Sequence, residues 1–139
     1  MTSNIDPTRE QFSEMMKLDD NGPIHMLNLI RLRDEAAYED GIKATGAQAY
    51  AAYGEHSGPI FKRVGGRIVW SGSPKNIVIG PADENWDIAF IAEYPNAAAF
   101  VDMVKDPTYQ AIVHHRQAAV CDSRLIRMQP QKAGDIFGS

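Results

Sequence analysis

The chain has 139 residues, a formal net charge of −4, and a composition that is 44% hydrophobic and 23% charged. These values are ordinary for one soluble globular domain, and the negative charge argues against general nucleic-acid binding, which needs a basic surface. We find no secretory signal and no apolar run near the roughly 20 residues of a membrane span, so we expect no membrane partner. A lone Cys121 excludes an intramolecular disulfide and fits a reducing cytoplasm.

A short helix and a central strand are predicted first. Asp6-Pro7 begins the helix, and the Asn-Gly-Pro turn at 21–23 ends it. The run 24–30 is apolar on both faces, which is typical of a strand that is covered on each side. Charged residues then predict a solvated connection over 31–43.

A long helix and two strand pieces are predicted next. The helix covers 45–64, and we expect a kink or a break at Gly58-Pro59, because proline removes a main-chain donor. Gly65-Gly66 ends this helix. Segments 67–71 and 77–79 then have the composition of strand pieces, as in a bent strand or a hairpin.

The last third of the chain predicts a strand, two helices and a final strand. Large residues alternate on one face of the strand 86–94, and Pro95-Asn96 caps the helix that follows it. Asp106 is a good N-cap for the next helix, and Pro107 stands where a first helical residue loses nothing by lacking an N–H. A final strand is expected over 123–128.

The order β-α-β-β-α-β after an extra N-terminal helix predicts a ferredoxin-like α+β fold, an antiparallel sheet with helices on one face. We expect a helical extension at 1–22, the ferredoxin-like domain at 23–128 and a tail at 129–139, whose Ile136-Phe137 is frayed or docks on a partner. The other face of the sheet would be bare in a monomer. A second copy is therefore expected to cover it in a face-to-face homodimer.

Short motifs are distributed over the region 24–128. They are Tyr53, Pro59-Ile60, Arg63 to Arg67, Glu93-Tyr94-Pro95, Asp106 to Ile112, Arg116 and Ser123 to Ile126. In combination they resemble the bacterial family called domain of unknown function 1330 (DUF1330). The resemblance implies a dimeric α+β barrel of ferredoxin-like subunits, but no established reaction and no agreed catalytic residues. Related barrel superfamilies include cofactor-free monooxygenases and lactone isomerases, which is an analogy of fold alone.

Arg116 lies in the middle of the apolar stripe of the last helix, among Tyr109, Ile112, Val113, Ala119 and Val120. A cation on a face that packs inward needs a partner. Arg116 either pairs with a carboxylate, such as Glu93 or Asp122, or offers its fork to the carboxylate or enolate of a small ligand.

Asn28 is the only amide in the apolar central strand. Its side chain either makes a structural hydrogen bond or points into a cavity, where it would bind a carbonyl or an oxyanion. Four aromatic side chains are candidates to line that cavity and bind a flat ligand, with ordinary core packing as the alternative; they are Tyr50, Tyr53, Trp70 and Tyr109.

The four histidines do not form a metal-binding motif. His114 and His115 are adjacent on a helix, so their side chains diverge by about 100° and do not readily share one ion. We therefore expect no metal and no other cofactor. His115 lies on the flank of the helix, where an imidazole could act as general base near neutral pH.

Two functions of different kinds follow. One is a small-molecule-binding protein that acts as a cofactor-independent enzyme, monooxygenase- or isomerase-like, on a small carbonyl, enol or carboxylate compound, with Arg116, His115 and Asn28 as catalytic residues. The other is a non-catalytic dimeric ligand-binding or structural module, in which the same residues make structural ion pairs and hydrogen bonds.

Overall fold

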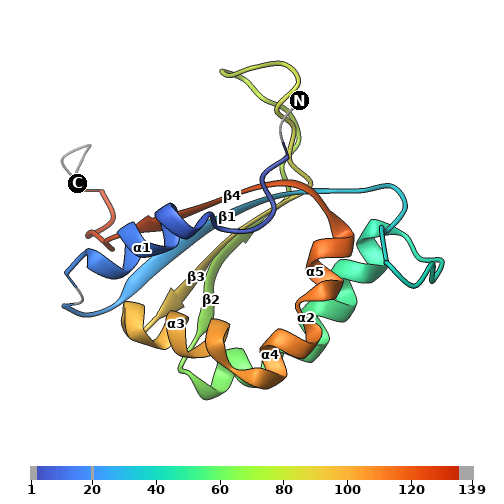
Figure 1. The fold of residues 1–139 in the computed structure, drawn as a ribbon. Helices are drawn as coiled ribbons and strands as arrows, with labels where there is room; N and C mark the ends of the chain where they lie inside the picture. Colours follow the sequence, from blue (N-terminus) through green and yellow to red (C-terminus); the bar gives the residue numbers. More distant parts are fainter. Residues whose placement is uncertain (1–2, 20, 135–139) are drawn as a thin grey trace.

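The computed structural model describes residues 3–19 and 21–134. Its elements, in chain order, are α1 (Arg9–Lys17), β1 (Ile24–Leu32), α2 (Gly46–Arg63), β2 (Arg67–Gly72), β3 (Ile88–Tyr94), α3 (Ala97–Lys105), α4 (Pro107–Ile112), α5 (His114–Ala119) and β4 (Val120–Met128). The four strands form one antiparallel sheet in the order β2-β3-β1-β4, and α2 to α5 line one side of it (Figure 1). The predicted ferredoxin-like α+β fold with an extra N-terminal helix is confirmed.

The core lies between the sheet and the helices. Because side chains alternate along a strand, β1 turns Ile24, Met26 and Ile30 toward the helices, and each is almost fully buried. One apolar cluster surrounds Met26 at the α3 end of the sheet, and a second surrounds Ile30 near α5. Asn28 stands between these two clusters on the same face of β1.

The opposite face of the sheet, called the open face below, carries a row of apolar side chains. Strand register aligns Trp70 with Ile91, Ile91 with Leu27, and Leu27 with Ile126, so the row crosses all four strands. Trp70 is 51% exposed and Ile126 is 46% exposed. No helix of the described part of the chain covers this row.

A kink or a break was expected at Gly58-Pro59; the break is wrong, because α2 runs without interruption through Pro59. Proline removes the hydrogen bond to the carbonyl four residues earlier, here that of Glu55. Glu55 and Pro59 are both exposed, so water can reach the freed carbonyl and replace the lost bond. Hydration of this carbonyl offsets part of the loss, and the helix continues through the proline.

The strand piece expected at 77–79 is also wrong. These residues belong to a loop, 73–87, that projects beyond the end of the sheet (Figure 1). Val78 is 84% exposed and Ile79 is 94% exposed, and no strand of the described chain pairs with them. High β-propensity alone does not produce a strand in a segment that pairs with no other strand.

The last predicted helix is confirmed at its start and divided in its middle. The Asp106 carboxylate accepts hydrogen bonds from the main-chain N–H groups of Thr108 and Tyr109, as an N-cap does. The helix divides into α4 and α5 at Val113. The predicted docking of Ile136-Phe137 lies outside the described residues.

A glycine-to-alanine comparison in α2 tests the close packing at the start of this helix. A Cβ atom on Gly46 would lie 1.9 Å from the main-chain oxygen of Arg33, whereas a Cβ atom on Gly54 would meet nothing within 4 Å. Gly46→Ala should therefore destabilise the protein by about 1–3 kcal/mol. Gly54→Ala, the matched control, should stabilise it by about 0.5–1 kcal/mol. Urea unfolding measures both, and equal effects would contradict the predicted clash.

Candidate functional site

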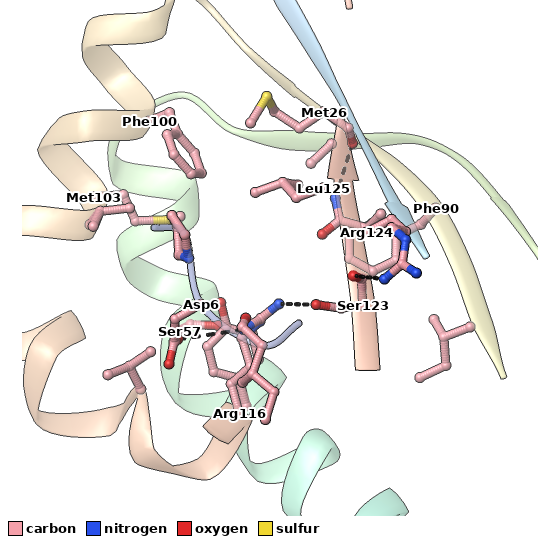
Figure 2. A pocket seen from close by; sticks show the side chains of 18 of the residues that line it. Asp6, Met26, Ser57, Phe90, Phe100, Met103, Arg116, Ser123, Arg124 and Leu125 are labelled. Carbon is pink, nitrogen blue, oxygen red and sulfur yellow. Dashed lines mark hydrogen bonds and ion pairs between the residues drawn. The ribbon is translucent and has the colours of Figure 1, made fainter. Parts of the chain in front are cut away.

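A cavity of about 1800 Å³ lies between the helical face of the sheet and the helices. All four strands contribute to one wall, and the helices, α1 included, contribute to the other. The chain preceding α1, residues 3–8, lies along one end of it. Figure 2 shows apolar side chains in one part of this cavity and polar side chains around Arg116 in another.

Arg116 places its guanidinium at this cavity, and its side chain is only 13% exposed. It donates one hydrogen bond to the main-chain carbonyl of Ile5. A second, over 3.3 Å, goes to the hydroxyl of Ser123 (Figure 2). The Asp6 carboxylate is 3.9 Å away and half exposed. The nearest partners of this nearly buried cation are therefore neutral oxygens.

The carboxylates expected to pair with Arg116 bind other groups. Glu93 accepts from Arg67 and contacts His25, both at 2.8 Å, on the open face of the sheet, so that expected pairing is wrong. Asp122 accepts from Arg124 at 2.9 Å and from the main chain of Asn4 at 3.0 Å. These bonds hold the pKa of both carboxyl groups below the ordinary range.

Asn28 points from β1 toward the same cavity. Its Nδ2 donates to the main-chain oxygen of Met26 at 3.0 Å, which uses one of its two N–H groups. No other hydrogen bond to this side chain occurs within the described chain. One N–H and the carbonyl oxygen of Asn28 therefore stay available for a ligand.

Three tyrosines meet where α2 and α4 border the cavity. The hydroxyl groups of Tyr53 and Tyr109 are 2.8 Å apart, and the rings of Tyr50 and Tyr53 lie 5.6 Å apart. Burial is the main cause that raises the pKa of all three hydroxyls above the ordinary value, while Arg116 opposes the rise weakly. These hydroxyls are therefore protonated at neutral pH and do not act as bases; in the Tyr53–Tyr109 pair one hydroxyl donates and the other accepts.

The structure brings five of the seven predicted site residues together, and it does not bring Trp70 to them. In a regular strand Trp70 would share a face with Ile68, which does line the cavity. A bulge between these two residues shifts the register, so that Trp70 faces the other side of the sheet. The expected contribution of Trp70 to this cavity is thus not realised.

His115 also lies outside the cavity, in a small aromatic cluster on the outer side of α5. Its Nδ1 is 2.7 Å from the Tyr38 hydroxyl, and its ring packs against those of His56 and His114 at 5.5 and 4.1 Å. Partial burial, followed by the two neighbouring histidines, lowers the pKa of His115 below its ordinary value. This position gives the imidazole no contact with a ligand in the cavity.

Sequence reasoning missed several residues at the site. Ser123 and Leu125 line the cavity from β4, and strict alternation along the predicted last strand could have identified them. Ser57 was missed although it lies one helical turn from Tyr53. Ile5 and Asp6 are more than 100 residues from Arg116 along the chain, and no local pattern predicts their contact with it.

Neither a metal centre nor a membrane segment emerges from the described ranges, 3–19 and 21–134. They contain no group of three or more His, Cys, Asp or Glu side chains that could hold a metal ion. None of their helices combines the length and the hydropathy needed to cross a membrane.

Comparison with known proteins gives one family and several similar structures. The family model described as "Domain of unknown function (DUF1330)" matches residues 41–128. No curated protein matches the chain. A crystal structure of methylated RPA0582 protein is 59% identical over 97% of this chain and 100% of its own, with a TM-score of 0.93. A structure of the RPA0582 protein of unknown function from Rhodopseudomonas palustris is also 59% identical, over 94% of this chain and 99% of its own, with a TM-score of 0.89.

A more distant structure shares the fold. SnoaB, a cofactor-independent oxygenase from Streptomyces nogalater, is 12% identical over 81% of this chain and 97% of its own, with a TM-score of 0.53. At this identity the similarity concerns the arrangement of helices and strands.

The histidine cluster predicts a loss of stability in mild acid. Because the pKa of His115 is lowered in the fold, its contribution is present above the ordinary value of about 6.5 and is lost as the pH falls below it. Between pH 7.5 and 5.5 the melting temperature of the wild type should therefore fall more than that of His115→Asn. Differential scanning fluorimetry at the two pH values measures this difference. An equal fall in both proteins would contradict the prediction.

Proposed function

Because the chain belongs to the family described as Domain of unknown function (DUF1330), which assigns no reaction, we propose a function from the geometry of its cavity. The protein binds a small organic compound that carries a carboxylate, enol or carbonyl oxygen. One observation carries this proposal. The guanidinium of Arg116 is nearly buried at the cavity, and its closest partners are neutral oxygens rather than a tightly bound carboxylate.

The polar end of the ligand would be held by donors from three elements. Arg116 offers its fork, which matches the two oxygens of a carboxylate or of an enolised dicarbonyl. Tyr53 and Tyr109 share one hydroxyl–hydroxyl bond, so one of their two O–H groups would donate to the ligand. Asn28 adds its second N–H from the sheet side. All these groups favour a ligand oxygen that is negative or becomes negative.

The apolar end of the ligand would lie against the other part of the cavity. Met26 and Phe90 from the sheet face Phe100 and Met103 from α3 there (Figure 2). Flat aromatic and flexible thioether side chains suit a flat, partly apolar skeleton. A pocket with an apolar body and a few directed polar groups is the usual form of a small-molecule site.

The reaction that such a site would favour is cofactor-independent and monooxygenase- or isomerase-like. Arg116 and Asn28, as catalytic residues, would stabilise the negative oxygen of the enolate that an acidic carbonyl or enol substrate gives when its proton passes to water. In the monooxygenase-like case, dioxygen would be the oxidant. SnoaB is a cofactor-independent oxygenase of the same fold, which supports this chemistry by analogy alone. Proton transfer by His115 is not part of the proposal, because that ring bonds to Tyr38 outside the cavity.

The second candidate function is a binding module without catalysis. It is favoured by the hydrogen bonds that Arg116 already makes within its own chain, to Ile5 and Ser123. Turnover of a bound carbonyl or enol compound, measured by loss of its ultraviolet absorbance, distinguishes an enzyme from such a module.

Ligand binding should be detectable by thermal shift. Benzoate, salicylate and acetylacetone represent the three oxygen classes, and saturating amounts of at least one should raise the melting temperature. Arg116→Met should reduce that rise by more than half, because a charge-assisted hydrogen bond contributes about 1.5–3 kcal/mol. Each shift is measured against the same variant without ligand, so that a change in basal stability does not count.

Arg9→Met is the matched control, because Arg9 is exposed on α1 and does not line the cavity. It should keep the full ligand-induced shift. An undiminished shift in Arg116→Met would remove this residue from the site. The absence of any shift for all three compounds would argue against the proposed function.

We also propose that the protein is a homodimer in which the open faces of two sheets pack together. The row of Trp70, Ile91, Leu27 and Ile126 supports this arrangement, because apolar residues that span a whole sheet are unfavourable in water. A twofold axis would place each row against its copy.

Sedimentation equilibrium at micromolar concentration should give the mass of a dimer. Ile126→Lys should shift the mass toward that of a monomer, because it would bury a charge in the interface. Ile42→Lys is the control, since Ile42 is 59% exposed in the connection before α2, away from the sheet. A wild-type monomer would refute the proposed homodimer.

A further inference from the structure

Residues 3–8, which we call the N-terminal strap, have no helical or strand structure and lie between α5, β4 and the cavity. Figure 1 shows this segment passing β4 before the chain enters α1. Apart from Ile5, its side chains are exposed. A segment with this little burial separates from the body of a protein more easily than a helix or a strand does.

The strap supplies some of the oxygen atoms around the guanidinium of Arg116, and β4 supplies another. The main-chain carbonyl of Ile5 accepts from Arg116 directly. Ser123 links the two segments, because its hydroxyl accepts from Arg116 at 3.3 Å and donates to the main-chain oxygen of Asn4 at 2.7 Å. The cation of the cavity and the strap therefore form one hydrogen-bonded unit.

Further polar contacts hold the strap without involving Arg116. The main-chain N–H and the side-chain amide of Asn4 donate to Asp122 at 3.0 and 3.2 Å. The Gln117 amide donates to the Asp6 carboxylate at 3.3 to 3.4 Å. Ile5, half-buried, packs against the core cluster around Ile30.

A ligand carboxylate would compete with the strap for Arg116. The strap offers mainly neutral acceptors, and the Asp6 carboxylate stands 3.9 Å from the guanidinium and is half exposed. A carboxylate that binds both arms of the guanidinium forms stronger, charge-assisted hydrogen bonds. The exchange requires movement of the strap alone, because helices and strands hold the other groups around the cavity.

We infer that the N-terminal strap regulates the cavity: it occupies Arg116 while the cavity is empty, and a carboxylate or enolate ligand displaces it. This inference rests on the proposed function, since it concerns the same ligand class and the same cation. A closed strap lowers the apparent affinity of the ligand by the fraction of molecules in which Arg116 is occupied. Weakening the strap should then strengthen binding.

The test uses the full chain with salicylate as the probe. Asn4→Ala combined with Gln117→Ala removes the side-chain contacts of Asn4 with Asp122 and of Gln117 with Asp6, and leaves Arg116 and Ser123 intact. Asn76→Ala combined with Gln129→Ala is the matched control, with the same residue types at exposed positions outside the cavity. Hydrogen–deuterium exchange of residues 3–8 reports strap opening, and calorimetric titration reports the dissociation constant of salicylate.

The strap variant should exchange faster over 3–8 and bind salicylate about two- to tenfold more tightly, while the control matches the wild type. Salicylate should also accelerate exchange of the strap in the wild type while it protects α2 around Tyr53. If the wild type binds and the strap variant binds equally or less tightly, the strap inference is refuted and the proposed function stands. If neither the wild type nor either variant binds salicylate, the strap inference is refuted. The proposed function is then tested separately by the thermal shifts with benzoate and acetylacetone.

Discussion

The alternation of side chains along β1 is the constraint on which the arrangement of this protein depends. β1 pairs with β3 on one side and β4 on the other, so each of its residues must face either the helices or the open side. Met26 and Asn28 consequently face the cavity, and Leu27 faces the opposite way. The positions of the core, the candidate site and the proposed dimer surface therefore all depend on this strand. A shift of its register by one residue would move the side chains of each face to the opposite face.

The second constraint is the cost of removing a cation from water. Arg116 cannot be buried among apolar side chains without oxygen acceptors. The main-chain carbonyl of Ile5, near the start of the described chain, and the hydroxyl of Ser123 in β4 accept hydrogen bonds from the guanidinium. The nearest carboxylate, that of Asp6, is half exposed and 3.9 Å from the guanidinium, so neither acceptor of a direct hydrogen bond is an anion. The hydrogen bonds that stabilise Arg116 in the empty protein therefore leave its charge able to bind an anionic ligand.

Local sequence patterns were sufficient to predict most of the fold, because they report periodicity and capping. The cap at Asp106 and the strand at 24–30 were predicted correctly, since their signals lie within a few residues. Whether α2 continues through Pro59 depends on which side of the helix faces water. Which face of the sheet carries Trp70 depends on one bulge in β2. Both depend on tertiary structure. Likewise, a central position in an apolar stripe indicated that Arg116 faces inward, but nothing local indicated that a segment over 100 residues away would meet it.

The loop 73–87 has a practical consequence for work on this protein. Its final part is fixed to the sheet, because Arg31 binds the carbonyl of Asp83 and Arg124 lies over the ring of Trp86. Its tip at 78–79 is almost fully solvated and belongs to no strand. Fluorophores or short epitopes attached at that tip would extend into solvent and leave the sheet and the cavity undisturbed. The chain thus offers a natural attachment point for labels that report on the site from a distance.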